Sequence, residues 1–397
     1  MNLHSKLLER EAAGRPVSVG VIGAGKFGTM FLSQARLTRG MHVAGVADLD
    51  VARARSQLKT AGWPEAAYAA SSLANAHGKR ATFVTQDGAA LIADPRIEVI
   101  VEATGVPGAG IRHCLSAIEH GKHIVMVNVE ADAVAGPLLA RKAKGAGVVY
   151  SLAWGDQPAL ICEHVDWARA AGFKVICAGK GTRYEPHYHQ SNPDNVWDIL
   201  DKYLNITDRA SINPKLFNSF VDGTKSGIEM TAVCNATGLS PQSDGLHFPP
   251  ATRFELAEVC KPKSAGGTLE KEGVTEVTSS VYRDGSDVPH HLALGTYVVI
   301  EGETDYARRC FKEYAMLPDK SGQYAALYRP IHMIGLELGI SVASCALRGE
   351  PTGAPTGFRS DVVATAKRAL KAGEMLDGEG GFCVWGRQTP ADRSLER

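Results

Sequence analysis

The sequence lacks three features that would assign it to a class at once: an excess of one charge, a long apolar run, and an apolar segment within its first 16 residues. Its 43 Lys and Arg residues balance 43 Asp and Glu residues, so the formal net charge is +0. A balanced chain has no global field that recruits nucleic acid or an acidic membrane. No run approaches the roughly 18 consecutive apolar residues of a membrane span, and residues 1–16 hold no apolar segment of a secretory signal. We expect a soluble, cytoplasmic protein with no nucleic-acid or membrane partner.

The cysteines form no regular pattern either. The eight of them include no CxxC pair, and most lie inside apolar runs, as Cys177 does in VICAG. This distribution is typical of thiols packed in the core of a protein from a reducing compartment. No internal repeat with a period of about 20–50 residues is present, which argues against a solenoid or a propeller.

What is present is an ordinary globular composition. The chain has 397 residues, of which 44% are hydrophobic and 22% are charged. This length predicts two or three domains with ample core.

The most informative segment is residues 17–28, VSVGVIGAGKFG. An apolar run that leads into Gly23, Gly25 and Gly28 predicts a buried strand, a tight turn and the start of a helix. In that arrangement the first glycine permits the turn and the second lets the backbone touch a pyrophosphate. The third lets the helix pack close to the strand. We therefore predict a dinucleotide-binding site here.

The residues after the second strand bear on the choice of cofactor. A β-type run, His42–Ala47, ends in Asp48, about 20 residues beyond the last glycine, where an acid binds the ribose. A carboxylate at this position repels a 2′-phosphate and so favours NAD. Arg53 and Arg55 follow one or two turns later and could bind a 2′-phosphate, or they could be solvated helix residues. The residues alone leave both cofactors open.

Strands and helices alternate through the first 150 residues. The further strands that we expect are Ala81–Thr85, Glu98–Thr104, His123–Asn128 and Val148–Ala153, and the helices between them are Gly88–Ala93, Pro107–His120 and Ala131–Gly145. This alternation implies a parallel, doubly wound sheet with right-handed crossovers. The predicted fold class is α/β, with a Rossmann-type dinucleotide-binding domain over residues 1–155.

The pattern changes near residue 155. We predict a second, α+β catalytic domain over residues 156–350, with Val277–Val281 and Leu292–Ile300 as its clear late strands. The apolar run Ile331–Ala346 predicts a buried helix that returns to the first domain. Residues 351–397 begin with the linker PTGAPTG and continue as the start of a small β-rich unit, too short to own a core.

Polar residues follow three strands at the carboxyl edge, where doubly wound sheets bind ligands. Thr104 and Gly105 follow one strand, Asn128 and Glu130 follow the next, and Asp156 follows the last. A polar residue in such a place either contacts a ligand or caps the following helix. The sequence leaves both roles open.

The most pointed cluster is FVDGTKSGIEM, residues 220–230. Asp222 can cap a helix whose first turns present Lys225, Ser226 and Glu229, and the lysine and the glutamate share a face because they are four residues apart. The alternative is a surface ion pair worth a few tenths of a kcal/mol. The apolar flanks and the many polar groups around one glycine turn favour a functional role.

Two basic residues and a histidine pair complete the candidates. Lys180 lies where a strand runs into a loop. It could bind a phosphate or polarise a carbonyl, or it could be a cap at the surface of the protein. Arg329 precedes the expected last helix and could clamp a phosphate or a carboxylate at its N-terminus. His187 and His189 face one side of an extended segment, but no third metal ligand is adjacent.

At this point the chain resembles a known group. The motif GAGKFG, the strand end EATGVP and the block FVDGTKSGIEMTAVCNATGL are similar to those of homoserine-dehydrogenase-like proteins with a C-terminal SAF domain. A subset of that family is the 1-deoxy-D-xylulose 5-phosphate reductoisomerase-like enzymes. The resemblance covers most of residues 15–385, and the tail from Ser360 looks like the opening of the SAF unit.

The chain departs from the family patterns in two places. It has Asn128-Val129 where homoserine dehydrogenases have Asn-Lys, and it lacks the Ser-Glu-His signature of the ordinary reductoisomerases. Catalytic residues cannot therefore be carried over from the latter family.

The resemblance implies NADPH-dependent reductoisomerisation of 1-deoxy-D-xylulose 5-phosphate to 2-C-methyl-D-erythritol 4-phosphate, in isoprenoid precursor synthesis, by a homodimer. A divalent metal, Mg²⁺ or Mn²⁺, would grip vicinal oxygens of the phosphorylated sugar. The candidate metal ligands are Asp156, Asp222 and Glu229. The candidate catalytic residues are Lys225, Asp222 and Lys180, and the candidate substrate-binding residues are Ser226, Arg329 and Glu130. The candidate cofactor-binding residues are Gly23, Gly25, Lys26, Phe27, Gly28, Asp48, Arg53, Thr104, Gly105 and Asn128.

Two alternatives stand beside this hypothesis. The first is a homoserine dehydrogenase or a related NAD(P)-dependent dehydrogenase, with Lys225 and Asp222 as the proton-handling pair and no need for phosphate or metal. The second is a non-catalytic sensor that binds the dinucleotide and uses the C-terminal tail as an interaction module.

Overall fold

A computed structural model describes residues 2–202, 209 and 213–396 of the protein. The chain divides into two compact units: residues 1–162 with 333–356, and residues 163–332 with 357–397. We refer to them as unit 1 and unit 2. The boundary falls within α8 (Gln157–Ala170). No helix among the described residues is long and apolar enough to cross a membrane.

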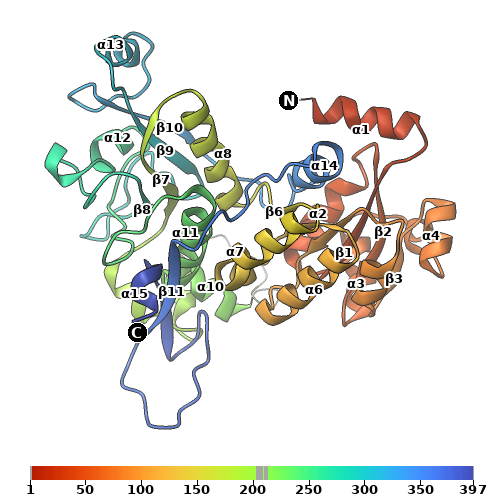
Figure 1. The fold of residues 1–397 in the computed structure, drawn as a ribbon. Coiled ribbons are helices and arrows are strands. Elements are labelled where there is room, and N and C mark those ends of the chain that lie inside the picture. The colour runs from red at the N-terminus through yellow and green to blue at the C-terminus, as the bar shows by residue number, and fades with distance from the viewer. Residues whose placement is uncertain (1, 203–208, 210–212, 397) are drawn as a thin grey trace. The chain divides into compact units, whose positions relative to one another are not determined.

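Unit 1 contains a six-stranded parallel sheet in the order β3-β2-β1-β4-β5-β6 (Figure 1). The strands are β1 (Val17–Ile22), β2 (Met41–Ala47), β3 (Phe83–Thr85), β4 (Val99–Glu102), β5 (His123–Met126) and β6 (Tyr150–Leu152). The order reverses on either side of β1, so the carboxyl ends of β1 and β4 form the switch point at which such sheets bind ligands. The predicted α/β fold class is confirmed.

Helices cover both faces of this sheet. They are α1 (Leu3–Ala12), α2 (Lys26–Ala35), α3 (Val51–Thr60), α4 (Leu73–Lys79), α5 (Gly88–Ala93), α6 (Pro107–Glu119), α7 (Val129–Gly145) and α14 (Gly339–Arg348), with a 3₁₀ turn, η1, at Glu65–Tyr68. Val19 and Val21 of β1 pack with α2, α3 and α14, whereas Ile22 packs with α5, α6 and α7. Successive strand residues point to opposite faces, which is why the fully buried strands of this sheet are apolar on both.

Unit 2 contains a four-stranded mixed sheet in the order β10-β9-β7-β8. Its strands are β7 (Lys174–Thr182), β8 (Val274–Ser279), β9 (Thr296–Glu301) and β10 (Tyr324–Arg329). The other elements are the 3₁₀ turns η2 (Pro186–Gln190) and η4 (Lys263–Ala265) and the helices α9 (Val196–Leu200), α10 (Pro214–Val221), α11 (Thr224–Thr237), α12 (Leu256–Val259) and α13 (Asp305–Glu313).

The two faces of this sheet differ in chemistry. One face is an apolar core in which Tyr297 of β9 packs with Leu256 and Ala257 of α12. The opposite face carries Thr296, which is hydrogen-bonded to His164 of α8, and Lys180, which is paired with Glu229 of α11. Thr296 and Lys180 are thus buried between this face of the sheet and the helices α8 and α11.

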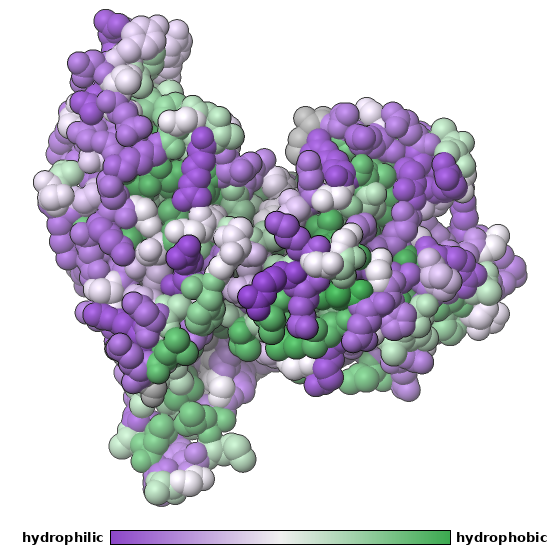
Figure 2. Space-filling view, viewed as in Figure 1, coloured by the Kyte–Doolittle hydropathy of each residue, from purple (hydrophilic) through white to green (hydrophobic). Residues whose placement is uncertain are grey.

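The C-terminal segment is an antiparallel hairpin, β11 (Ser360–Ala366) and β12 (Val384–Pro390), followed by the short helix α15 (Ala391–Ser394). It is part of unit 2 and packs along α11. The loop between its strands exposes Leu370, Met375, Leu376 and Phe382. Figure 2 shows hydrophobic side chains gathered on this loop.

Three differences from the sequence-based expectation concern the later part of the chain. The predicted helix over 331–346 begins only at Gly339, because the chain turns at Gly335, whose φ is +72°. Arg329 therefore ends a strand, β10, which was not predicted, and does not lie at a helix N-terminus. The strand expected at 292–300 begins at Thr296, since Leu292 accepts a turn hydrogen bond from Gly295.

Candidate functional site

The glycine turn of unit 1 has the shape that a pyrophosphate site needs. Gly23 has a φ of +102°, and a Cβ there would lie 2.5 Å from the carbonyl oxygen of Ala103; a Cβ at Gly28 would lie 2.3 Å from the oxygen of Gly23. These two positions are filled by the protein's own backbone. A Cβ at Gly25 would meet no atom within 4 Å. The open space at the N-terminus of α2 is where a dinucleotide pyrophosphate fits.

Asp48 organises this turn from the end of β2. The carboxylate is buried; its Oδ2 accepts from the backbone N–H of Ala24 at 2.8 Å, and its Oδ1 accepts from that of Asp50 at 2.9 Å. Arg53 donates to the same Oδ1 at 2.7 Å, and its side chain remains 54% exposed. The residue predicted to bind a ribose is therefore neutralised by an arginine that still faces solvent.

The carboxyl ends of β4 and β5 carry further predicted residues. Thr104 donates through its hydroxyl to the buried carboxylate of Glu102 at 2.6 Å, and Glu102 also pairs with His113 at 3.2 Å. Asn128 caps α7 by accepting from the backbone N–H of Ala131, which is the capping role left open by the sequence. Glu130 lies in the first turn of the same helix.

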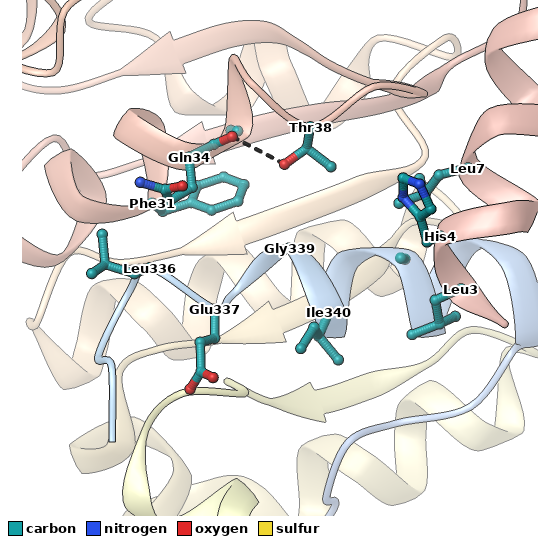
Figure 3. Close-up of a pocket in the computed structure, with 12 residues that line it drawn as sticks. Leu3, His4, Leu7, Phe31, Gln34, Thr38, Leu336, Glu337, Gly339 and Ile340 are labelled. Carbon is teal, nitrogen blue, oxygen red and sulfur yellow. Dashed lines mark hydrogen bonds between the residues drawn. The ribbon is translucent and has the colours of Figure 1, made fainter. Parts of the chain in front are cut away.

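Unit 1 also has a groove of about 340 Å³ (Figure 3). It lies between α1, α2 and α14 and is lined by Leu3, His4, Leu7, Phe31, Gln34, Ala35, Thr38, Leu336, Glu337, Gly339, Ile340 and Ala343. None of the predicted site residues is among them, so the groove is separate from the cofactor turn.

In unit 2 the strand register aligns three polar residues across the sheet. Lys180 of β7 pairs with Thr296 of β9, and Thr296 pairs with Arg329 of β10. Directly opposed residues of antiparallel strands share one face of the sheet. We call Lys180, Thr296 and Arg329 the polar row.

Lys180 is the most enclosed cation of the row. Its side chain is 4% exposed and forms an ion pair with Glu229 of α11, whose side chain is 3% exposed. The loop after β8 runs close to Gly181, the residue that follows Lys180. A Cβ at Gly181 would lie 1.8 Å from the carbonyl oxygen of Leu292. The ion pair with Glu229 holds the ammonium group of Lys180 against α11.

Helix α8 completes the face above the polar row. His164 contacts the hydroxyl of Thr296 through Nε2 at 3.0 Å. Burial, together with the charge of Arg329, lowers the pKa of His164 to about 4. The imidazole is thus neutral at physiological pH, and the cations of this region are Lys180, which is paired with Glu229, and Arg329.

Asp222 has a different environment from the one expected of a catalytic acid. Its buried carboxylate accepts from the ammonium group of Lys367 at 2.7 Å and from the backbone N–H of Thr224 at 2.9 Å. Burial raises the pKa of Asp222, while Lys367 opposes that shift. Lys225 and Ser226 follow in the first turn of α11, half-buried and buried respectively.

Two family models match the chain. Residues 19–152 match the family model described as homoserine dehydrogenase, NAD binding domain, and residues 155–338 match that described as oxidoreductase DRL, catalytic domain. The protein is an NAD(P)-dependent oxidoreductase. Catalysis, and not dinucleotide sensing alone, is thereby indicated for the chain.

Solved structures of dehydrogenases and reductases are similar to this oxidoreductase at low identity. A homoserine dehydrogenase from Thiobacillus denitrificans is 16% identical over 83% of this chain and 73% of its own, with a TM-score of 0.47. A myo-inositol dehydrogenase from Lactobacillus casei is 15% identical over 73% and 72%, with a TM-score of 0.39. A dihydrodipicolinate reductase from Paenisporosarcina sp. is 12% identical over 85% and 97%, with a TM-score of 0.38. No curated protein matches the chain.

Two of the three acids predicted as metal ligands of the oxidoreductase are paired with a lysine. Asp222 is paired with Lys367 and Glu229 with Lys180, and Asp156 directly precedes α8. Within the part of the chain that the structure describes, no three His, Cys, Asp or Glu side chains are grouped to hold an ion. The donor set does not fit Mg²⁺ or Mn²⁺, because a hard cation needs carboxylate oxygens that are not already neutralised.

The histidine pair is not a metal site either. His189 must donate from Nδ1 to the carbonyl oxygen of Asp222 at 2.7 Å, so its Nε2 accepts from the hydroxyl of Tyr184 at 2.9 Å. Both ring nitrogens are occupied, and burial lowers the pKa of the imidazole.

The sequence indicates Lys180, Glu229 and Arg329 as separate candidates but gives no reason to group them. It does not indicate Thr296 or Lys367. A threonine that begins a strand carries no signal by itself. Lys367 lies in what the sequence presents as an appended tail, so nothing links it to Asp222, 145 residues earlier.

Proposed function

We propose that the protein is an NADPH-dependent dehydrogenase that interconverts the carbonyl and hydroxyl forms of a small anionic substrate, with Lys180 as the residue that handles the proton. The observation that carries this proposal is the buried Lys180–Glu229 pair, whose lysine lies in one row with Thr296 and Arg329. A buried ion pair contributes little net stability, because desolvation offsets the attraction. A catalytic role therefore explains the buried Lys180–Glu229 pair better than a contribution to folding stability does.

The residues of the row have complementary tasks. When NADPH is bound, it supplies a hydride to the carbonyl carbon of the substrate. The ammonium group of Lys180 donates a proton to the oxygen on which negative charge develops, and the carboxylate of Glu229 holds that ammonium group in place. In the reverse direction the neutral amine accepts the proton of the hydroxyl group.

Arg329 and Thr296 suit the charged part of the substrate. A guanidinium binds a carboxylate or a phosphate through two parallel hydrogen bonds, and a hydroxyl can add a third. His164 is neutral and Lys180 is paired with Glu229, so the guanidinium of Arg329 is the group of this face that suits an anion. We assign the anionic group of the substrate to Arg329.

Arg53 supports NADPH over NADH as the reductant. Its guanidinium lies at the ribose-binding acid and is half-exposed, so it can contact a 2′-phosphate while it neutralises Asp48. The free carboxylate that would repel a 2′-phosphate is therefore absent from the described turn.

Reductoisomerisation of 1-deoxy-D-xylulose 5-phosphate is the second candidate. A guanidinium at the end of the polar row, that of Arg329, favours a phosphorylated keto-sugar over an uncharged one. The metal that this chemistry would need has no ligand set among the described residues. We therefore place a metal-independent dehydrogenase first.

The test is cofactor turnover by the purified protein with phosphorylated keto-sugars, their unphosphorylated forms, and homoserine with related hydroxy acids. Each assay is run with NADPH or NADH (NADP⁺ or NAD⁺ for the alcohols), and with either EDTA or Mg²⁺. We expect turnover of an anionic substrate in EDTA, with NADPH preferred. Turnover of deoxyxylulose phosphate that depends on Mg²⁺ would favour the second candidate. Turnover of uncharged substrates alone would contradict the assignment of Arg329.

A further inference from the structure

The C-terminal hairpin delivers a lysine into the interior of unit 2. Lys367 follows β11, and its side chain is 3% exposed. Its ammonium group donates to Asp222 Oδ2 at 2.7 Å, to the carbonyl oxygen of Ser191 at 2.6 Å and to that of Gly381 at 2.8 Å. An ammonium group has three N–H donors, so all three are used within the protein.

Asp222 connects this lysine to the start of α11. Its Oδ1 accepts from the backbone N–H of Thr224, in the first turn of the helix. Its carbonyl oxygen accepts from His189, whose ring stacks on Trp385 of β12 at 3.7 Å between centroids. The turn before α11 is thus held from the hairpin on two sides.

The hairpin also fixes the face of α11 that is turned away from the sheet. Gly386 of β12 donates to the hydroxyl of Thr224 at 2.8 Å, and a Cβ at Gly227 would lie 3.1 Å from the carbonyl oxygen of Gly386. Glu229 is two residues beyond Gly227, which is about 200° around an α-helix. The helix is therefore held between the hairpin on one side and Lys180 on the other.

We propose that Lys367 is a positioning residue for the Lys180–Glu229 pair: it compensates the charge of Asp222 and so fixes the N-terminus of α11, which sets Glu229 against Lys180. This inference rests on the proposed function of Lys180. No part of it requires Lys367 to touch the substrate or the cofactor.

The experiment compares full-length variants by steady-state kinetics over a range of pH. Lys367→Met removes the ammonium group at nearly constant size, and Lys371→Met makes the same change at an exposed lysine of the same loop. We expect Lys367→Met to lower kcat at least tenfold, with less than a twofold change in the KM for NADPH. Lys371→Met should match the parent protein.

The pH profile separates positioning from general loss of structure. In Lys367→Met the buried Asp222 has lost its cation, so its ionisation disturbs the turn and kcat should fall further as the pH rises. His189 also contacts Asp222, through the carbonyl oxygen of that residue, and Arg387 acts on this histidine. The double variant Lys367→Met/Asp222→Asn has no unpaired charge, and it should lose this pH dependence and recover most of kcat.

Three results would overturn the inference: a parent-like kcat in Lys367→Met, a kcat profile parallel to the parent's, or a double variant no more active than Lys367→Met. If Lys367→Met does not fold, Lys367→Arg takes its place. Arginine keeps the charge but cannot reach all three acceptors, so its kcat should fall without a new pH dependence, and an unchanged kcat would refute the inference. Failure of the proposed function is distinct, because it would appear as full activity in Lys180→Met.

Discussion

Arg53 donates to Oδ1 of Asp48 over 2.7 Å, and Oδ2 of the same carboxylate accepts from the backbone of the glycine turn. Asp48 thus connects the glycine turn to a half-exposed arginine. We expect Arg53→Ala to raise the KM for NADPH about tenfold, since a charge-assisted hydrogen bond contributes about 1.5 kcal/mol or more. The KM for NADH should change less than twofold.

Arg55→Ala is the matched control for this change. Arg55 is two residues along α3, and its guanidinium lies over the ring of Tyr68 at 5.9 Å from the centroid. This variant should keep the NADPH preference of the parent protein. Equal losses with both cofactors in Arg53→Ala would show that the arginine supports the turn and does not read the 2′-phosphate.

The glycine turn gives a second prediction, in which two similar substitutions have different effects. Gly25→Ala should leave the thermal midpoint nearly unchanged, because its Cβ meets no atom, and should weaken dinucleotide binding at least tenfold. Gly28→Ala should lower stability, because its Cβ would lie 2.3 Å from the backbone of Gly23. Thermal unfolding with and without NADPH measures both, and a Gly25→Ala variant that binds normally would place the pyrophosphate elsewhere.

The buried carboxyl group of Asp132 in α7 should make the folding stability of the protein depend on pH. Burial raises its pKa to about 7, although the hydroxyl of Tyr150 donates to its carboxylate at 2.7 Å. The unfolded chain releases this proton near pH 4, so between about pH 4 and 7 the folded state holds more protons and its stability falls as the pH rises. Asp132→Asn should therefore gain stability relative to the parent as the pH rises, by about 1 to 3 kcal/mol at pH 7.5.

Denaturant unfolding at pH 5 and pH 7.5 checks this result. Asp166→Asn, at an exposed position on α8, serves as the control and should show no comparable trend. A stability difference between Asp132→Asn and the parent that stays constant with pH would refute the account of this buried acid.

Chelation gives a fourth prediction. Because Glu229 and Asp222 are neutralised by Lys180 and Lys367, we expect EDTA to change kcat less than twofold. The enzyme is assayed after dialysis against EDTA and again with added Mg²⁺ or Mn²⁺. A loss of kcat in EDTA that is restored only by added Mg²⁺ or Mn²⁺ would contradict this prediction. It would show that the two ion pairs open and that their acids bind a metal.

The first half of the fold could be predicted from the sequence because its signals are local. Each strand of unit 1 is a short apolar run, and the glycines at 23, 25 and 28 fix the turn at the switch point. The helix α5 at Gly88–Ala93 was predicted at the bounds that it has. Local periodicity decides such elements before any long-range contact is known.

The site of unit 2 depends on register and on distant contacts, which no local pattern reveals. Lys180 and Glu229 were recognised as chemically unusual, but their pairing follows from how α11 packs on β7. Arg329 was placed at a helix start because the apolar run over residues 331–346 predicts one helix, whereas α14 begins only at Gly339. Asp222 was assigned to chemistry, whereas the hairpin gives it a buried lysine that lies far away in the sequence.

The most direct test of the central claim is the turnover of Lys180→Met on the substrate that the parent protein reduces. The account predicts that kcat falls about 10²- to 10⁴-fold, the usual contribution of a positioned general acid, while NADPH binding measured by fluorescence is unchanged. Lys180→Met/Glu229→Gln, which leaves no unpaired buried charge, should be equally inactive. A kcat within threefold of the parent value in either variant would contradict the account.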